Sequence, residues 1–108
     1  MIRVTVFRKN DQIQAFEISG HANSGPYGYD LVCAGVSAVS FGAVNAAIQL
    51  CDVELTIDQA GKGGYLYIEI PSTLSDQKST QIQLIFEAML ISLQTIERDY
   101  NQFIHIKD

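Results

Sequence analysis

The sequence has few cysteines, and the two it has cannot form a disulfide framework. Among 108 residues only Cys33 and Cys51 carry a thiol, and both fall in a segment expected to be one helix. A continuous helix between them separates the two positions by roughly 27 Å, whereas the Cα atoms of a disulfide lie within about 7 Å. We therefore expect two free thiols, which are typical of a reducing compartment.

Positive charge is also scarce. Seven Lys and Arg residues face twelve Asp and Glu residues, which gives a net charge of −5. Because phosphate neutralisation supplies most of the affinity of nucleic-acid-binding proteins, direct binding of nucleic acid is not expected. The chain start alternates like a strand and lacks the apolar region of a signal peptide. No apolar run seen in the sequence approaches the ~20 residues of a membrane span. We expect a cytoplasmic protein without a membrane partner.

Common metal and nucleotide motifs are missing as well. His21, His105 and the two cysteines do not have the spacing of a zinc site. The glycine-rich stretch that starts at Gly20 is not followed by the Gly-Lys-Ser/Thr of a P-loop, and it lacks the Gly-x-Gly-x-x-Gly order of a dinucleotide site. We expect neither a metal nor a cofactor.

The hydrophobic pattern predicts one α+β domain over residues 1–108. Helices are expected from Leu31 to about Cys51, with Asp30 as the N-cap, and from Ser75 to about Asn101. Alternating or β-branched segments predict four strands and, optionally, a fifth: 2–8, 12–19, 53–58, 65–70 and 103–106. The order ββαββα(β) indicates an antiparallel sheet of four to five strands packed with two helices.

The residues that could carry chemistry lie between Gly20 and Ser37. His21 follows the second strand, Cys33 falls in the first turn of the expected helix, and a glycine-bearing loop connects them. Backbone N–H groups of a first helical turn lack intrahelical partners, so they favour a thiolate and could hold an oxyanion. The helix dipole contributes only about 0.3–1 kcal/mol. Strong activation of the Cys33 thiol therefore requires His21 as an ion-pair partner.

Plainer interpretations of the same residues stay open at this point. A cysteine in an apolar helix is usually a small buried hydrophobe, which we expect for Cys51 and keep as an alternative for Cys33. His105 is expected to be structural. Ser37 lies one turn after Cys33 on the same helix face. Asp30 either orients His21 as the third member of a triad or caps the helix, and the cap is the favoured interpretation.

The same stretch resembles a family, the bacterial ribosomal-processing cysteine proteases called Prp. The resemblance rests on Gly20-His21-Ala22, on the glycine-bearing loop, and on DLVCAGVSA from Asp30 to Ala38. The later run from Met89 to Ile96 and the chain length also resemble the family. The resemblance covers essentially the whole chain.

This resemblance implies a site, a substrate and an assembly. It places the nucleophile on Cys33 and the proton-transfer histidine on His21, with Asp30, Ser37 and Ala34 in support. It implies a substrate loop that closes over the active site and contains Gly20, Gly25, Tyr27, Gly28 and Tyr29. The implied substrate is the precursor of large-subunit ribosomal protein twenty-seven, cut after an aromatic residue to remove a short N-terminal extension. The implied assembly is a homodimer.

Two other functions remain alternatives. The first is a non-catalytic, ribosome-associated module that holds a peptide in an apolar groove. The second is a different Cys–His acyl hydrolase, such as a thioesterase. The mass of an incubated precursor separates the protease from the binding module, and turnover of small acyl thioesters identifies the hydrolase.

Overall fold

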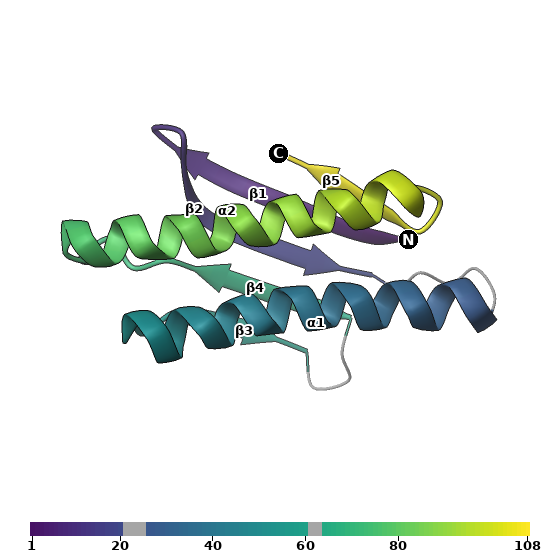
Figure 1. Cartoon of the computed structure of the whole chain (residues 1–108), viewed down its shortest axis with the longest axis horizontal. Helices are drawn as coiled ribbons and strands as arrows, with labels where there is room; N and C mark the ends of the chain where they lie inside the picture. The colour runs from purple at the N-terminus through teal and green to yellow at the C-terminus, as the bar shows by residue number, and fades with distance from the viewer. Residues whose placement is uncertain (21–25, 61–63) are drawn as a thin grey trace.

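The structure is a computed structural model that describes the chain except for residues 21–25 and 61–63, and that describes only the backbone of residues 26–30. In the described residues a five-stranded sheet has the order β3-β4-β2-β1-β5, and both helices lie on one face of it (Figure 1). The elements follow the order ββαββαβ: β1 (Ile2–Lys9), β2 (Gln12–Ser19), α1 (Pro26–Cys51), β3 (Thr56–Gln59), β4 (Tyr65–Glu69), α2 (Asp76–Asp99) and β5 (Ile104–Lys107). The predicted fold class is confirmed.

The β1–β2 hairpin shows how the local sequence sets the sheet. Asn10 and Asp11 have φ angles of 53° and 64°, the left-handed values that a tight hairpin turn requires and that Asn and Asp tolerate. The alternation along β1 buries Ile2, Val4 and Val6 on the helix-covered face. The predicted strands at 2–8 and 12–19 are therefore confirmed.

One feature of the sheet differs from the expected antiparallel arrangement, because β5 pairs parallel to β1. The other pairs, β1–β2, β2–β4 and β3–β4, are antiparallel. Two reversals along β1, β2 and β4 leave β4 parallel to β1 and thus to β5. The long α2 helix makes the crossover that such a parallel return needs, so the sheet is mixed.

The core lies between the sheet and the helices. Phe16 of β2 and Phe86 of α2 are fully buried, and their rings meet edge to face with centroids 5.2 Å apart. The α2 helix begins after Ser75, whose side chain accepts a hydrogen bond from the Lys78 N–H. Its buried face follows the helical repeat: Ile82, Phe86, Met89, Leu90 and Leu93.

The start of α1 differs from the prediction. The helix begins at Pro26, so Asp30 is its fifth residue and not its N-cap. Proline suits a first helical position because its fixed φ matches the helix and its missing N–H would have no intrahelical partner there. The predicted loop is therefore shorter than expected, because Tyr27, Gly28 and Tyr29 belong to the first turn of α1.

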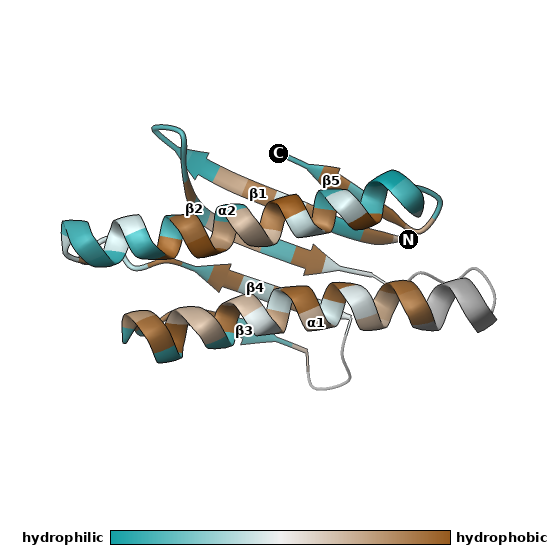
Figure 2. Ribbon diagram, in the orientation of Figure 1, coloured by the Kyte–Doolittle hydropathy of each residue, from teal (hydrophilic) through white to brown (hydrophobic). Residues whose placement is uncertain are grey.

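The composition of α1 also corrects the expectation about membrane spans. Leu31–Cys51 is long and apolar enough to cross a membrane by length and composition alone, a test that core helices of soluble proteins also pass. Figure 2 shows hydrophobic or intermediate residues along most of this helix, whereas α2 is hydrophilic at both ends. In the fold, Val32, Val36, Val44 and Ala47 are buried in the core, but only 28% of the apolar segment is buried.

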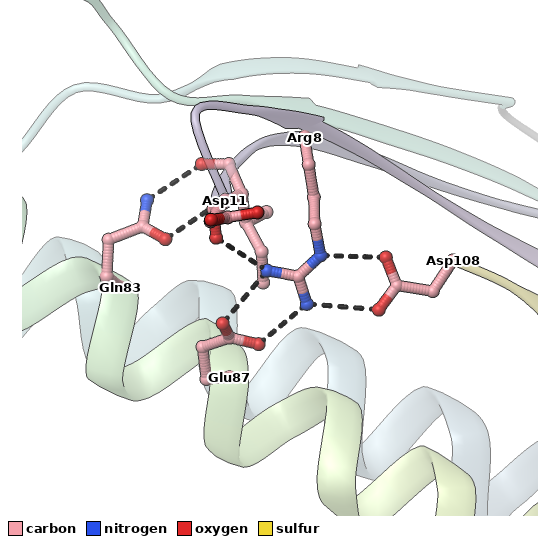
Figure 3. A network of polar contacts seen from close by, with 6 residues as sticks. Arg8, Asp11, Gln83, Glu87 and Asp108 are labelled. Carbon is pink, nitrogen blue, oxygen red and sulfur yellow. Dashed lines mark hydrogen bonds and ion pairs between the residues drawn. The ribbon is translucent and has the colours of Figure 1, made fainter.

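A polar network fastens the chain end to the hairpin and to α2 (Figure 3). The Arg8 guanidinium donates to both carboxylate oxygens of Glu87 at 2.9 Å and to those of Asp108 at 2.8 and 3.0 Å. It also donates to the Asp11 carbonyl oxygen at 3.0 Å. The hydrogen bonds from Arg8 lower the pKa values of the Glu87 and Asp108 carboxyls below their usual range.

We expect Arg8→Met to destabilise the fold by about 1–2 kcal/mol, a range discounted for partial solvent exposure. Because the folded-state pKa values of both carboxyls are lowered, their contribution is full above the unfolded values near pH 4 and is lost as the pH falls through the folded values. Thermal melts at pH 7 and pH 3 therefore show a difference between wild type and variant that shrinks in acid. Arg98→Met is the control, since its contact to Asp99 is long and exposed. A pH-independent difference contradicts the assignment.

Candidate active site

A cavity of about 220 Å³ opens between α1 and the ends of β2, β3 and β4. None of the described residues around it is charged, and most are apolar or small: Ile2, Ile18, Gly20, Cys33, Val36, Ser37, Ser40, Phe41, Gln59, Ala60, Gly64, Tyr65 and Leu66. A cavity of this size fits one large side chain rather than a whole small-molecule ligand, since ligand pockets occupy roughly 300–1,000 Å³.

The two cysteines have different surroundings. Cys33 is partly exposed and lines the cavity, whereas Cys51 is buried, with 5% of its surface exposed. Both thiols are free. The prediction that Cys51 is a small buried hydrophobe is confirmed, and of the two thiols the one at Cys33 faces the cavity.

The helix start does not activate Cys33 in the way the sequence predicts. With α1 beginning at Pro26, Cys33 is the eighth helical residue, about 10 Å along the axis from the first. Its backbone N–H lies beyond the unpaired first turn, and the dipole effect is confined to that turn. The prediction that the orphan N–H groups of the first turn surround this thiol is therefore wrong. Because the described cavity wall carries no charge, activation requires a group from outside it.

Two serines follow Cys33 on the same flank of α1. Ser37 is exposed and lines the cavity one turn on, as the spacing predicts. Ser40, which sequence reasoning missed, also lines the cavity, but it is buried and its hydroxyl donates to the Val36 carbonyl oxygen at 2.7 Å. Ala34 is exposed and is not among the described residues that line the cavity. Of these two cavity serines, only Ser40 has a hydroxyl that bonds to a described residue.

Tyr65 borders the cavity from β4, but its hydroxyl is engaged elsewhere. The hydroxyl donates to Glu17 Oε2 at 2.9 Å across the sheet. This hydrogen bond to a carboxylate raises the pKa of Tyr65 above its usual value, because tyrosinate would lose the donor and repel Glu17. Tyr65 therefore contributes a wall and not an acid or base.

Several predicted site residues cannot be compared with the structure. His21 and Gly25 lie outside the described residues, as do the side chains of Tyr27, Tyr29 and Asp30. Their roles stay predictions. In the part of the chain that is described, no group of three His, Cys, Asp or Glu side chains could hold a metal ion.

Gly20 brings the chain to the cavity immediately before His21. Its φ of 91° lies in the region that favours glycine, and its N–H donates to the Gly64 carbonyl oxygen at 2.9 Å. A Cβ at this position would collide with the Met1 carbonyl oxygen, which is backbone and cannot easily move aside. Glycine is therefore required at this cavity wall on both conformational and steric grounds.

We expect Gly20→Ala to destabilise the fold by about 2 kcal/mol, since it combines a left-handed conformation with overpacking. Gly42→Ala is the matched control. A Cβ at Gly42 meets nothing within 4 Å, and alanine is favoured in a helix by about 0.5–1 kcal/mol. Urea denaturation measures both changes. Equal stability of Gly20→Ala and wild type would contradict the strained geometry.

The far wall of the cavity had no signal in the sequence. Gln59, Ala60 and Leu66 come from β3, its end and β4, and Phe41 comes from the flank of α1 two turns beyond Cys33. Only the sheet order and the packing of α1 over it bring these residues to Cys33. Knowledge of strand order would have been needed to find them.

Comparisons with known proteins give a consistent result. Residues 1–105 match the family model described as cysteine protease Prp. The ribosomal processing cysteine protease Prp of Bacillus subtilis (strain 168) is 48% identical over 107 residues, covering 98% of this chain and 96% of that protein. The protein of the same name from Staphylococcus aureus (strain Mu50) is 43% identical over 99 residues, 90% of each chain.

Solved structures agree over almost the whole chain. The S. aureus protease Prp in complex with a covalently linked product peptide matches with a TM-score of 0.87 and 41% identity, covering 99% of this chain and 98% of that one. The same protease in complex with a substrate peptide matches with a TM-score of 0.85 and 39% identity, with the same coverage of both chains. SMU.848 from Streptococcus mutans matches with a TM-score of 0.82 and 37% identity, covering 99% of this chain and 92% of that one.

Proposed function

The chain belongs to the cysteine protease Prp family, and from this premise we propose that it removes the N-terminal extension from a ribosomal protein precursor. It is a ribosomal-processing cysteine protease by its family. Our proposal names the precursor of large-subunit ribosomal protein twenty-seven as the substrate, cut after an aromatic residue. It assigns the nucleophile to Cys33 and proton transfer to His21.

One observation supports this assignment above the others. Cys33 is a partly exposed thiol at a cavity whose described wall residues are uncharged and include Gly20, the residue bonded to His21. A nucleophile needs access to substrate and a base within reach. Cys51, buried in the core, meets neither requirement among the described residues.

The cavity supports the proposed preference for an aromatic residue. Ile2, Ile18, Val36, Phe41 and Leu66 give it apolar walls, and its volume of about 220 Å³ suits one large side chain. Burial of an apolar side chain is worth about 1.5–3 kcal/mol, which favours a large hydrophobic residue over a small or charged one next to the scissile bond.

The proposed mechanism is acyl transfer through a thioester. The Cys33 thiolate attacks the scissile carbonyl carbon, and His21 protonates the leaving amine as the C–N bond breaks. The extension remains bound to sulfur as a thioester. His21 then takes a proton from water, the resulting hydroxide attacks the thioester, and the C–S bond breaks to return the thiol. The covalently linked product peptide of the S. aureus relative supports a covalent route.

The supporting residues have narrower roles in this proposal. The Ser37 hydroxyl, one turn beyond Cys33 at the cavity, is suited to hydrogen-bond His21 or the substrate backbone. Asp30 orients His21, because its expected role as a helix cap is excluded by the start of α1 at Pro26. Closure over the peptide is assigned to the predicted substrate loop, which contains Gly20, Gly25, Tyr27, Gly28 and Tyr29; the last three lie in the first turn of α1.

We further propose a homodimer in the cytoplasm, where a ribosomal protein precursor would be met. The surface of α1 supports the homodimer. No residue between Leu31 and Cys51 is charged, yet Leu31, Phe41 and Leu50 are 58%, 42% and 78% exposed. Exposed apolar side chains on a helix without charges favour packing against a second chain.

The test is the mass of a precursor peptide incubated with the protein. Cleavage at one bond after an aromatic residue supports the proposal. An unchanged mass after long incubation, with the peptide still bound, supports a non-catalytic binding module instead. Turnover of small acyl thioesters with no peptide cleavage supports a different acyl hydrolase.

A further inference from the structure

The β3 strand is a free edge of the sheet that leads to the cavity. It is the last strand in the order β3-β4-β2-β1-β5, and within the described residues it pairs only with β4. All four of its residues, Thr56–Gln59, are exposed. An edge strand presents a row of unpaired N–H and C=O groups that can pair with another extended chain.

The pairing register identifies which backbone groups point outward. The Ala60 N–H donates to the Tyr65 carbonyl oxygen at 3.2 Å, so this pair belongs to the hydrogen-bonded type in the β3–β4 ladder. Such pairs alternate with non-hydrogen-bonded pairs in antiparallel sheets. The backbone N–H and C=O groups of Thr56 and Asp58 therefore also point toward β4. The N–H and C=O groups of Ile57 and Gln59 face the free edge.

The free edge is continuous with the cavity at Cys33. Gln59 and Ala60 line that cavity together with Cys33 and Ser37. Ile57 pairs with Ile68, which is fully buried under the helices, so the Ile57 side chain lies on the helix side of the sheet. The Ile57 side chain is 45% exposed, and that of Phe41 in α1 is 42% exposed. An exposed apolar side chain, that of Ile57, thus accompanies the unpaired backbone groups.

We propose that the polypeptide substrate binds as an additional β-strand on the outer edge of β3, using the N–H and C=O groups of Ile57 and Gln59. This inference rests on the proposed protease function and adds how the peptide is held. Two outward-facing residues offer two donors and two acceptors, spread over roughly 7 Å of strand. Alternate substrate side chains would then face the apolar surface beside Ile57, and the strand would deliver the chain to Cys33.

A substrate series tests the proposal on the wild-type protein. Each amide N–H of a precursor peptide is removed in turn by replacing the amide with an ester, and kcat/KM is measured for every member. Strand addition predicts an alternating profile outside the scissile bond, in which every second replacement lowers kcat/KM by about 3- to 10-fold and the others have little effect. A flat profile overturns the proposal.

A pair of variants tests the same point from the enzyme side. Ile57→Pro removes an outward N–H and is compatible with an edge strand, whereas Ile57→Ala removes the side chain and keeps the N–H. We expect kcat/KM for Ile57→Pro to fall about 3- to 10-fold below that of Ile57→Ala, the same effect as one lost hydrogen bond in the substrate series. Alkylation of Cys33 by iodoacetamide, which needs no peptide, should proceed at equal rates in both and so report an intact site.

The outcomes separate the two proposals. Equal kcat/KM for the two variants, with wild-type cleavage intact, overturns strand addition and leaves the protease function standing. A dimer that becomes a monomer only in Ile57→Pro, without loss of cleavage, shows that the edge pairs with a second copy and also overturns it. No cleavage by the wild-type protein overturns both proposals.

Discussion

Replacing Cys33 with alanine is expected to abolish cleavage of the precursor peptide, with a loss of at least about 10³-fold in kcat. The thiol is the atom that forms the acyl bond in the proposed mechanism, and alanine has no group that could replace it. Ser40 already donates to a backbone carbonyl oxygen. His21→Ala should lower kcat by about 10²–10⁴-fold, the usual contribution of a general acid or base.

The matched control for the Cys33 variant is Cys51→Ala, which changes the same residue type in the same helix. Cys51 is buried and does not line the cavity, so the variant should keep its cleavage rate and lose only a little stability. Mass spectrometry of the digested peptide measures all three variants. Efficient cleavage by purified Cys33→Ala, or its loss in a folded Cys51→Ala, would assign the chemistry to another residue.

Phe86→Ala is expected to destabilise the protein by about 3–5 kcal/mol, which is a large part of the ~5–15 kcal/mol that keeps a domain folded. Phe86 joins α2 to the centre of the sheet, is fully buried, and meets the Phe16 ring edge to face at 5.2 Å. Truncation leaves a cavity that the sheet cannot fill, because Phe16 is fixed between β1 and β4 in the strand order. The urea midpoint should fall accordingly.

Leu84→Ala is the control for Phe86→Ala, because it truncates a large apolar side chain on the same helix that is 73% exposed. Its effect should stay within about 0.5 kcal/mol, as for other surface substitutions. If the two variants lost similar amounts of stability, α2 would not be packed through the Phe86 face.

The sequence was sufficient to predict the elements whose patterns are local. The alternation of Ile2, Val4 and Val6 and the turn residues Asn10 and Asp11 are local signals for the first hairpin, and the apolar repeat from Ile82 to Leu93 is a local signal for the buried face of α2. These signals depend on residues within one or two turns of each other. Each is confirmed by burial or backbone geometry.

Two features of the fold needed information beyond local pattern. The position of β5 beside β1 depends on the path of α2 across the sheet, which no periodicity records. The start of α1 was placed too late because Asp30 has a strong preference for caps, and Gly28 and the adjacent tyrosines look like a loop. Pro26 at the first helical position, an equally recognised start signal, was the better guide.

The candidate site divides in the same way. Cys33, Ser37 and Gly20 were predicted from one continuous stretch, and the structure brings all three to one cavity. Gln59, Ala60 and Leu66 were missed because β3 and β4 come to Cys33 only through the tertiary fold. The activation of Cys33 is also changed, since a thiol at the eighth position of a helix receives little from the helix end. Because the helix end contributes little, the proposal depends more strongly on His21 to activate the Cys33 thiol.

Covalent labelling with a substrate-like electrophile tests the central claim most directly. A precursor peptide ending in an aromatic chloromethyl ketone would be incubated with the folded protein, and the modified residue located by mass spectrometry. Our account predicts one adduct per chain, on Cys33, with parallel loss of cleavage and no adduct on Cys51. Cleavage that continues after Cys33 is fully modified would contradict it.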